Sequence, residues 1–223
     1  MDQSMAEDVQ IDAAGVRLAG NLVPPLDGGA IVVFVHGSGS SRLSPRNRYV
    51  AGVLNDAGLG TLLFDLLTPE EEADRANVFD IRLLAERLES VTRWLRSVRG
   101  VAGEVGYFGA STGAAAALWA AAGSGDEIYA IVSRGGRPDL AMPHLPAVRV
   151  ATLLIVGGRD ETVLQLNREA QAQLRCPNEL AIVPGATHLF EEPGALEAVA
   201  ERARDWFLGW SAPHYGRPAS RSA

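Results

Sequence analysis

The sequence has little cysteine, no lysine and no long apolar run, and two of these absences exclude a class of protein. It contains a single cysteine, Cys176, which excludes an internal disulfide and favours a cytoplasmic protein. It contains no lysine, because all twenty basic residues are arginine, and we interpret this as a bias of genomic composition. No apolar run approaches the roughly 18 residues that span a bilayer, since the longest, residues 114–122, is about half as long. We therefore expect neither a disulfide scaffold nor an integral membrane protein.

Acidic residues outnumber basic ones, 27 to 20. The formal net charge is −7 and the isoelectric point is about 5.1, so nothing favours binding to the phosphates of a nucleic acid. Residues 1–8 carry three acidic groups and neither a basic nor an apolar segment, so we expect no secretory signal. A hydrophobic content of 47% is typical of a folded globular protein. These features predict a soluble cytoplasmic protein without a nucleic-acid or membrane partner.

Short apolar segments alternate with amphipathic ones along almost the whole chain. Residues 9–12 and 16–22 alternate apolar and polar side chains around Ala14-Gly15, which is typical of an antiparallel hairpin. Buried strands are then expected at residues 30–35, 60–67, 105–108, 129–133, 151–156 and 179–183. Helices are expected at residues 47–57, 81–98, 114–122, 162–174 and 193–210. This alternation predicts an α/β fold with a mostly parallel twisted sheet and helices on both faces.

The segments between the expected strands and helices indicate how the chain is divided into domains. We expect one domain over residues 1–210 and a flexible tail over residues 211–223, which is rich in Ser, Pro, Gly and Arg. The acidic residues 70–74 are expected to form a solvated loop. Residues 137–150 barely supply the dozen residues that a crossover between parallel strands requires, so no lid domain is expected there.

The segment Gly109-Ala110-Ser111-Thr112-Gly113 joins an apolar strand directly to an alanine-rich helix. A Gly-x-Ser-x-Gly turn in this setting presents the serine hydroxyl at the carboxyl end of a parallel sheet. The glycines are needed because side chains would obstruct the sharp turn and the close approach of strand and helix. The motif by itself is weak evidence, and a plain strand-to-helix turn is the alternative. Its setting makes Ser111 the candidate nucleophile.

Two later strands are followed by side chains that complete a catalytic set. Asp160 and His188 each come shortly after an expected strand. Active sites of such sheets form at the carboxyl ends of the strands, and the chain order Ser, Asp, His is that of α/β-hydrolases. We assign His188 as general base and acid and Asp160 as the carboxylate that orients it. A helix N-cap is the ordinary alternative for Asp160, and the other candidate carboxylates are Asp139 and, with less support, Glu161.

An acyl-transfer site also needs N–H groups to bind the oxyanion. One backbone donor is expected from Thr112, directly after the nucleophile, and a second from Gly37 or Ser38 in the loop at residues 36–40. A loop that is merely flexible is the alternative. His36 lies on the same loop and is a candidate to contact the substrate.

Arginines follow two of the expected strands and are candidates to bind a substrate carboxylate through paired hydrogen bonds. We select Arg42 and Arg134 from a set that also contains Arg46, Arg48 and Arg137. Such arginines more often pair with structural carboxylates, and Asp65 is the expected partner. No cluster of His, Cys and carboxylate residues has the spacing of metal ligands, so we expect no metal and no organic cofactor.

Together these motifs resemble the dienelactone-hydrolase-like branch of the α/β-hydrolases over residues 9–210. The segments that carry the resemblance are His36–Arg42, Ser44–Arg48, Gly109–Gly113, Ser133–Pro138, Gly157–Asp160 and Pro184–Phe190. The resemblance implies an α/β-hydrolase fold and a Ser-His-Asp triad. It does not extend to a dienelactone substrate, because dienelactone hydrolases have a cysteine where this chain has Ser111. Members similar to this chain also occur fused to a phosphoribosyltransferase domain.

We therefore expect a serine hydrolase that cleaves small carboxylic esters or lactones through an acyl-enzyme. The alternatives are a non-catalytic binding or scaffold protein that serves a phosphoribosyltransferase, and a peptidase or acyltransferase with the same triad. The sequence leaves a homodimer and a phosphoribosyltransferase partner open.

Overall fold

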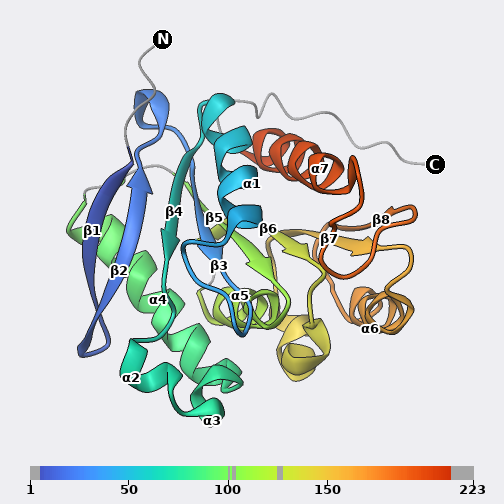
Figure 1. Ribbon diagram of the computed structural model, residues 1–223, viewed down its shortest axis with the longest axis horizontal. Coiled ribbons are helices and arrows are strands. Elements are labelled where there is room, and N and C mark those ends of the chain that lie inside the picture. The colour runs from blue at the N-terminus through green and yellow to red at the C-terminus, as the bar shows by residue number, and fades with distance from the viewer. Residues whose placement is uncertain (1–5, 100, 102–103, 125–127, 212–223) are drawn as a thin grey trace.

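The computed structural model describes residues 6–99, 101, 104–124 and 128–211, and one mixed sheet runs through them (Figure 1). Eight strands form this sheet in the order β1-β2-β4-β3-β5-β6-β7-β8. β1 (Glu7–Ala13) and β2 (Val16–Val23) pair as an antiparallel hairpin, and β2 also runs antiparallel to β4. The predicted α/β fold with an N-terminal hairpin is confirmed.

The other six strands are parallel and form the centre and the far edge of the sheet. Their sequences are apolar with little interruption because helices cover both faces of the sheet. They are β3 (Ile31–Val35), β4 (Gly60–Phe64), β5 (Val105–Ala110), β6 (Ile128–Arg134), β7 (Ala151–Gly157) and β8 (Asn178–Val183).

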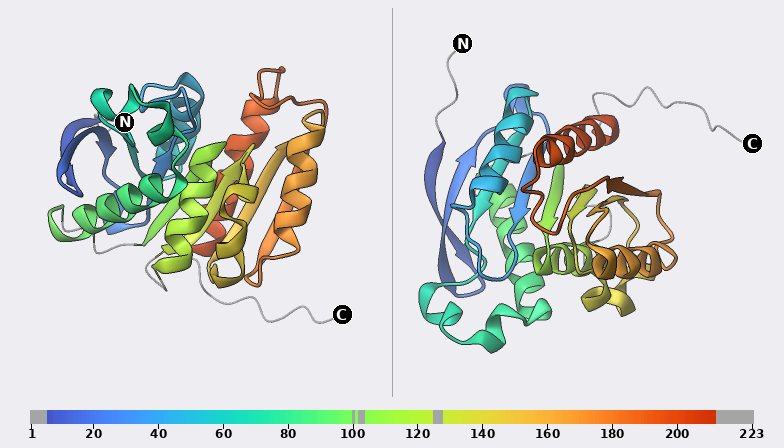
Figure 2. Two further views of the ribbon diagram at one scale, coloured as in Figure 1. Left: turned by 90° about the horizontal axis from the view of Figure 1, so that it is seen from below. Right: turned by 45° about the vertical axis from the view of Figure 1, so that its right-hand side comes forward.

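Helices cover the two faces of the sheet unequally (Figure 2). α1 (Pro45–Asp56) and α7 (Ala195–Trp210) pack together on one face. The opposite face carries α4 (Ile81–Ser97), α5 (Thr112–Gly123), α6 (Glu161–Gln171) and the 3-10 helix η3 (Pro138–Ala147). η3 lies in the crossover between β6 and β7, the segment that the sequence predicted to be too short for a lid domain.

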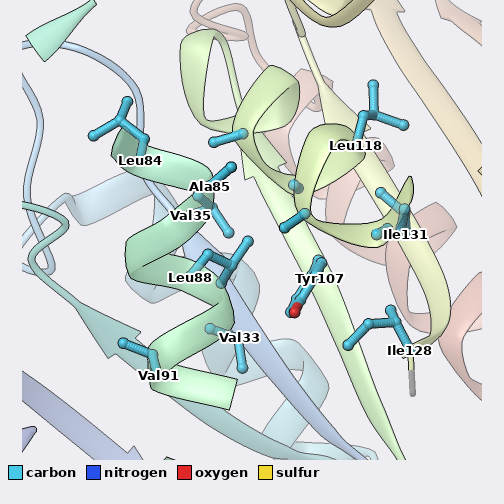
Figure 3. Close-up of a cluster of buried hydrophobic side chains, with 14 of the residues drawn as sticks. Val33, Val35, Leu84, Ala85, Leu88, Val91, Tyr107, Leu118, Ile128 and Ile131 are labelled. Carbon is cyan, nitrogen blue, oxygen red and sulfur yellow. The ribbon is translucent and has the colours of Figure 1, made fainter. Parts of the chain in front are cut away.

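The core is divided into two main clusters, one on each face. Side chains along β3 alternate between them, with Val33 in the cluster under α4 and α5 and Phe34 in the cluster under α1 and α7. Leu88 of α4 and Tyr107 of β5 meet in the first cluster (Figure 3). The Tyr107 hydroxyl lies 2.7 Å from Thr92 Oγ1, so its one polar atom is satisfied in the interior.

The acidic segment after Thr68 is helical, so the prediction of a solvated loop there is wrong. It forms α2 (Pro69–Glu72), followed by α3 (Arg75–Val78). Thr68 and Glu71 make a reciprocal capping box, which supplies partners for free N–H groups at the start of α2. Glu71 also forms an ion pair with Arg87, a buried residue of α4. This pair fixes α2 against the body of the protein.

Two predictions concern the C-terminal tail and membrane-spanning helices. The tail predicted over residues 211–223 lies outside the described residues except for Ser211. Among the helices that are described, none combines the length and the apolar character needed to cross a membrane.

Candidate active site

Ser111 occupies a strained turn between β5 and α5. Its φ is 51° and its ψ is −119°, a backbone conformation that non-glycine residues rarely adopt and that costs about 1–3 kcal/mol. The flanking glycines permit this turn, because a Cβ at Gly113 would overlap the Val35 carbonyl oxygen and one at Gly109 would overlap α5. The turn therefore has the geometry of a nucleophile elbow, which presents the serine side chain at the end of the sheet.

The backbone around Ser111 ties this turn to two neighbouring segments. The Ser111 amide donates to the Arg134 carbonyl oxygen over 3.2 Å, and the Ser111 carbonyl oxygen accepts from the Arg137 amide over 3.0 Å. On the other side, a Cβ added at Gly37 would lie 3.0 Å from Ser111 Cβ. Ser111 thus lies between the end of β6 and the loop that follows β3.

Asp160 and His188 are in direct contact. His188 Nδ1 lies 2.6 Å from Asp160 Oδ2, and the side chains are 39% and 15% exposed. Asp160 stands at the N-cap position of α6 but makes no capping hydrogen bond, so its carboxylate is committed to the imidazole instead of the helix. If the proton is on Nδ1, Nε2 is left as a base.

The other candidate carboxylates have different surroundings. Asp139 accepts two hydrogen bonds from Arg137, over 2.8 and 2.7 Å. Glu161 is exposed in the first turn of α6. Of the three carboxylates weighed from the sequence, the structure therefore brings only Asp160 against His188.

The His188 loop packs against the ends of β6 and β7. Gly135, which follows β6, has a φ of +52°, and a Cβ there would lie 3.5 Å from His188 Cε1. Gly157, at the end of β7, approaches the Ala186 carbonyl oxygen so closely that a side chain would overlap it. Ser111 therefore adjoins Arg134, and His188 adjoins the next residue, Gly135, although Ser111 and His188 are far apart in the sequence.

The loop after β3 is held by a neutral histidine. His36 Nδ1 lies 3.0 Å from the Gly37 carbonyl oxygen, and Nε2 accepts the Leu66 amide over 3.1 Å. Burial lowers the pKa of His36 below its ordinary value. Both ring nitrogens are thus used by the backbone, and the predicted contact between His36 and a substrate has no free nitrogen to make it.

The same loop contacts Thr112, the residue after Ser111. The Ser38 amide donates to Thr112 Oγ1 over 2.9 Å. Thr112 is buried, so this hydroxyl is a fixed partner rather than a mobile surface group. The Ser38 amide, one of two expected oxyanion donors in the loop, is therefore already engaged by a side chain, a contact that the sequence did not reveal.

A cavity of about 210 Å³ adjoins this loop. Its walls are residues 36–43, together with Asp65, Leu66, Leu67, Pro69, Glu72, Val78 and Leu84. It is smaller than the roughly 300–1,000 Å³ of pockets for drug-sized ligands, so it suits a small group. The contribution of α2 and α3 to its wall was missed from the sequence, although the capping signal at Thr68 could have indicated these helices.

The two arginines selected from the sequence differ sharply. Arg42 lies in the cavity wall and is paired with Asp65 through its guanidinium and, over 2.8 Å, through its amide. This is the structural pairing that the sequence suggested. Arg134 is 8% exposed and makes no ion pair within the described residues, while burial and nearby Arg46 lower its pKa to about 10.

No three His, Cys, Asp or Glu side chains of the described segments gather as a metal site would require.

Comparison with known proteins places the chain among hydrolases. A solved dienelactone hydrolase from Anabaena variabilis is 54% identical, with a TM-score of 0.90 over 93% of this chain and 99% of that one. The esterase Est1E from Butyrivibrio proteoclasticus is 17% identical, with a TM-score of 0.78 over 91% of this chain and 98% of its own. The second likeness shows the fold alone.

Two curated relatives from Mycobacterium tuberculosis are 62% identical over 203 residues. Their name describes them provisionally as phosphoribosyl transferases. The match covers 91% of this chain and 46% of each relative, so the chain spans about half the length of these proteins. No protein-family model matches the chain.

Proposed function

Because this chain belongs to the dienelactone hydrolase family of α/β-hydrolases, we propose that it is a serine hydrolase that cleaves small carboxylic esters or lactones. The observation that carries the proposal is the 2.6 Å contact between His188 Nδ1 and Asp160 Oδ2, at the edge of the sheet where the strained Ser111 lies. A base that is oriented by a carboxylate beside a serine is the arrangement that activates a hydroxyl for attack.

In the proposed reaction, Ser111 Oγ attacks the ester carbonyl carbon while His188 Nε2 takes the hydroxyl proton. The carboxylate of Asp160 stabilises the imidazolium that forms, and the Thr112 and Gly37 amides bind the oxyanion, since the Ser38 amide is held by Thr112 Oγ1. The carbon–oxygen bond to the alcohol then breaks, and His188 returns the proton to the leaving oxygen. Water attacks the acyl-enzyme with the same proton transfers and releases the acid. In a lactone the alcohol stays attached to the acid.

The small cavity adjoins the loop of the proposed oxyanion donors and is lined by neither Ser111 nor His188, so it suits a small group of the substrate on that side. Its apolar wall residues include Leu66, Leu67 and Val78, which suit a short hydrocarbon group next to the proposed oxyanion donors. Ser111, where dienelactone hydrolases have a cysteine, gives no support to a dienelactone in particular.

The test is the loss of activity when the serine hydroxyl is removed. We expect Ser111→Ala to fold normally and to reduce kcat for a short-chain 4-nitrophenyl ester by roughly 10⁴- to 10⁶-fold. A fluorophosphonate probe should label the native protein and not this variant. Ser133→Ala is the matched control, because Ser133 is a buried serine on β6 whose Oγ has no partner among the described residues. Equal activity of the native protein and Ser111→Ala would reject the proposal.

We also propose that any phosphoribosyl transfer by the longer relatives belongs to the part that this chain does not match. The matched part is nearly the whole of a hydrolase structure, since the Anabaena protein aligns over 99% of its own length. This chain should therefore release no pyrophosphate from phosphoribosyl pyrophosphate in the presence of nucleobases. Pyrophosphate release by the purified chain would contradict this assignment.

A further inference from the structure

Asn167 is a buried amide in the middle of α6, where neither its burial nor its place in a helix is favourable. The residue is fully buried, and its Oδ1 has no hydrogen-bond partner in the described part of the chain. Asparagine is a weak helix former, and a buried amide oxygen without a partner is costly. Local rules are expected to be broken in this way where a residue serves a function elsewhere in the structure.

The Asn167 side chain uses both of its amide hydrogens. Its Nδ2 donates to the Val163 carbonyl oxygen over 2.8 Å and to the Gly136 carbonyl oxygen over 3.0 Å. The first hydrogen bond stays within α6. The second reaches the turn over residues 135–137, which connects β6 to η3. This second hydrogen bond is therefore what the buried amide supplies beyond its own helix.

The turn over residues 135–137 lies between Ser111 and His188. The Arg137 amide donates to the Ser111 carbonyl oxygen over 3.0 Å. On the other side, a Cβ added at Gly135 would lie 3.3 Å from the His188 carbonyl oxygen and 3.5 Å from His188 Cε1. A displacement of this turn would therefore move Ser111 and His188 relative to each other.

The same helix also holds the carboxylate that contacts the histidine. Asp160 stands at the N-cap of α6, and its Oδ2 lies 2.6 Å from His188 Nδ1. Asn167 follows seven residues later, which is about two helical turns, so both residues lie on the same side of the helix. Val163 and Leu164, between them, are buried on that side. α6 thus holds the proposed base through Asp160 and the turn beside the base through Asn167.

We propose that Asn167 is a positioning residue of the hydrolase. By holding the Gly136 carbonyl, it fixes the turn over residues 135–137 and with it the separation of Ser111 Oγ and His188 Nε2. A misplacement of about 1 Å can cost about 100-fold in rate, even when the altered residue is far from the chemistry. The inference rests on the proposed function, since it concerns how the residues of that reaction are held.

Two variants separate the two hydrogen bonds of Asn167. Asn167→Leu has a similar volume and removes both of them. Asn167→Thr keeps a hydroxyl that can bond to the Val163 carbonyl oxygen within the helix, but this hydroxyl is too short to reach Gly136. Both variants should lower kcat for a short-chain 4-nitrophenyl ester about 10- to 100-fold. KM should stay within about twofold, because a buried residue does not touch the substrate. Should Asn167→Leu fail to fold, Asn167→Thr still decides the question.

Thr92→Val is the matched control for loss of a buried hydrogen bond on a helix. Thr92 is buried on α4, where its Oγ1 donates to the Leu88 carbonyl oxygen over 2.9 Å and lies 2.7 Å from the Tyr107 hydroxyl. This variant should lower the melting temperature and keep kcat within about twofold of the native value. An equal loss of kcat in Thr92→Val, or a native kcat in folded Asn167→Thr, would show that Asn167 does not position the site.

Hydrogen exchange separates this inference from the proposed function, because it needs no turnover. The Gly135 amide donates to the Ile155 carbonyl oxygen over 2.8 Å, and the Arg137 amide donates to Ser111. Exchange of both amides should be at least about tenfold faster in Asn167→Thr than in the native protein, and unchanged in Thr92→Val.

The outcomes of exchange and activity together decide between the two proposals. Faster exchange in Asn167→Thr, with no ester hydrolysis by the native protein, would reject the hydrolase and keep the anchoring of the turn. Ester hydrolysis by the native protein, with exchange and kcat both unchanged in Asn167→Thr, would keep the hydrolase and reject the role of Asn167. In an active hydrolase, a change in exchange alone or in kcat alone would also reject that role.

Discussion

Replacement of Asp160 by asparagine tests the contact on which the proposed mechanism depends. Two unit charges about 4 Å apart interact by about 4 kcal/mol at an effective dielectric constant of about 20. The side chains of His188 and Asp160 are 39% and 15% exposed, so solvent screening should reduce this to about 2–3 kcal/mol. Loss of that stabilisation from the imidazolium transition state corresponds to about 30- to 150-fold in kcat. The asparagine NH₂ can also donate to Nδ1 and favour the tautomer with a protonated Nε2, which raises the expected loss toward the ~10⁴-fold known for serine proteases.

The assay is steady-state hydrolysis of a short-chain 4-nitrophenyl ester, with thermal unfolding to show that the variant is folded. Asp139→Asn is the matched control, because Asp139 was the alternative carboxylate and its partner is Arg137. We expect Asp139→Asn to keep kcat within about threefold of the native value, since it lacks a contact with His188. A folded Asp160→Asn variant that keeps kcat within threefold, or loss of activity in Asp139→Asn instead, would refute the role assigned to Asp160.

Three further predictions concern the surroundings of the site. Burial lowers the pKa of His36 in the folded protein, so the unfolded chain binds the proton first as the pH falls. The melting temperature should therefore fall as the pH drops below about 6.5, the ordinary pKa of histidine. His36→Gln should lose the part of this pH dependence that His36 contributes. Thr112→Val removes the hydroxyl that accepts the Ser38 amide and should lower kcat/KM about 10-fold. Thr112→Ser keeps the hydroxyl, so its kcat/KM should stay near the native value. A native kcat/KM in Thr112→Val would show that the contact is dispensable. Arg87→Met leaves Glu71 unpaired and should lower the free energy of unfolding by about 2–4 kcal/mol in urea titrations, and a change below 1 kcal/mol would contradict the importance of this pair.

The strands and the elbow were predictable because they depend on neighbours in the sequence. A parallel strand buried on both faces needs a run of apolar residues, as in β3 and β7, so its position can be read without knowing its partners. Ser111 could be singled out because close approach of β5 and α5 requires glycine at two fixed positions beside it. The helices α2 and α3 were missed, even though the Thr68–Glu71 capping box is itself a local signal.

Which charged groups have partners became clear from the folded arrangement alone. The sequence could not tell whether Asp160 caps α6 or orients His188, because aspartate is common before a helix for both reasons. Nor could it separate Arg42, which is paired with Asp65, from Arg134, which is buried and has no ion-pair partner among the residues that the structure describes. The order of the elements and the place of the proposed nucleophile were already evident from the sequence, since periodicity and turn chemistry act over a few residues. Ion pairing and burial depend on distances between residues far apart in the chain, and these exist only once the sheet is assembled.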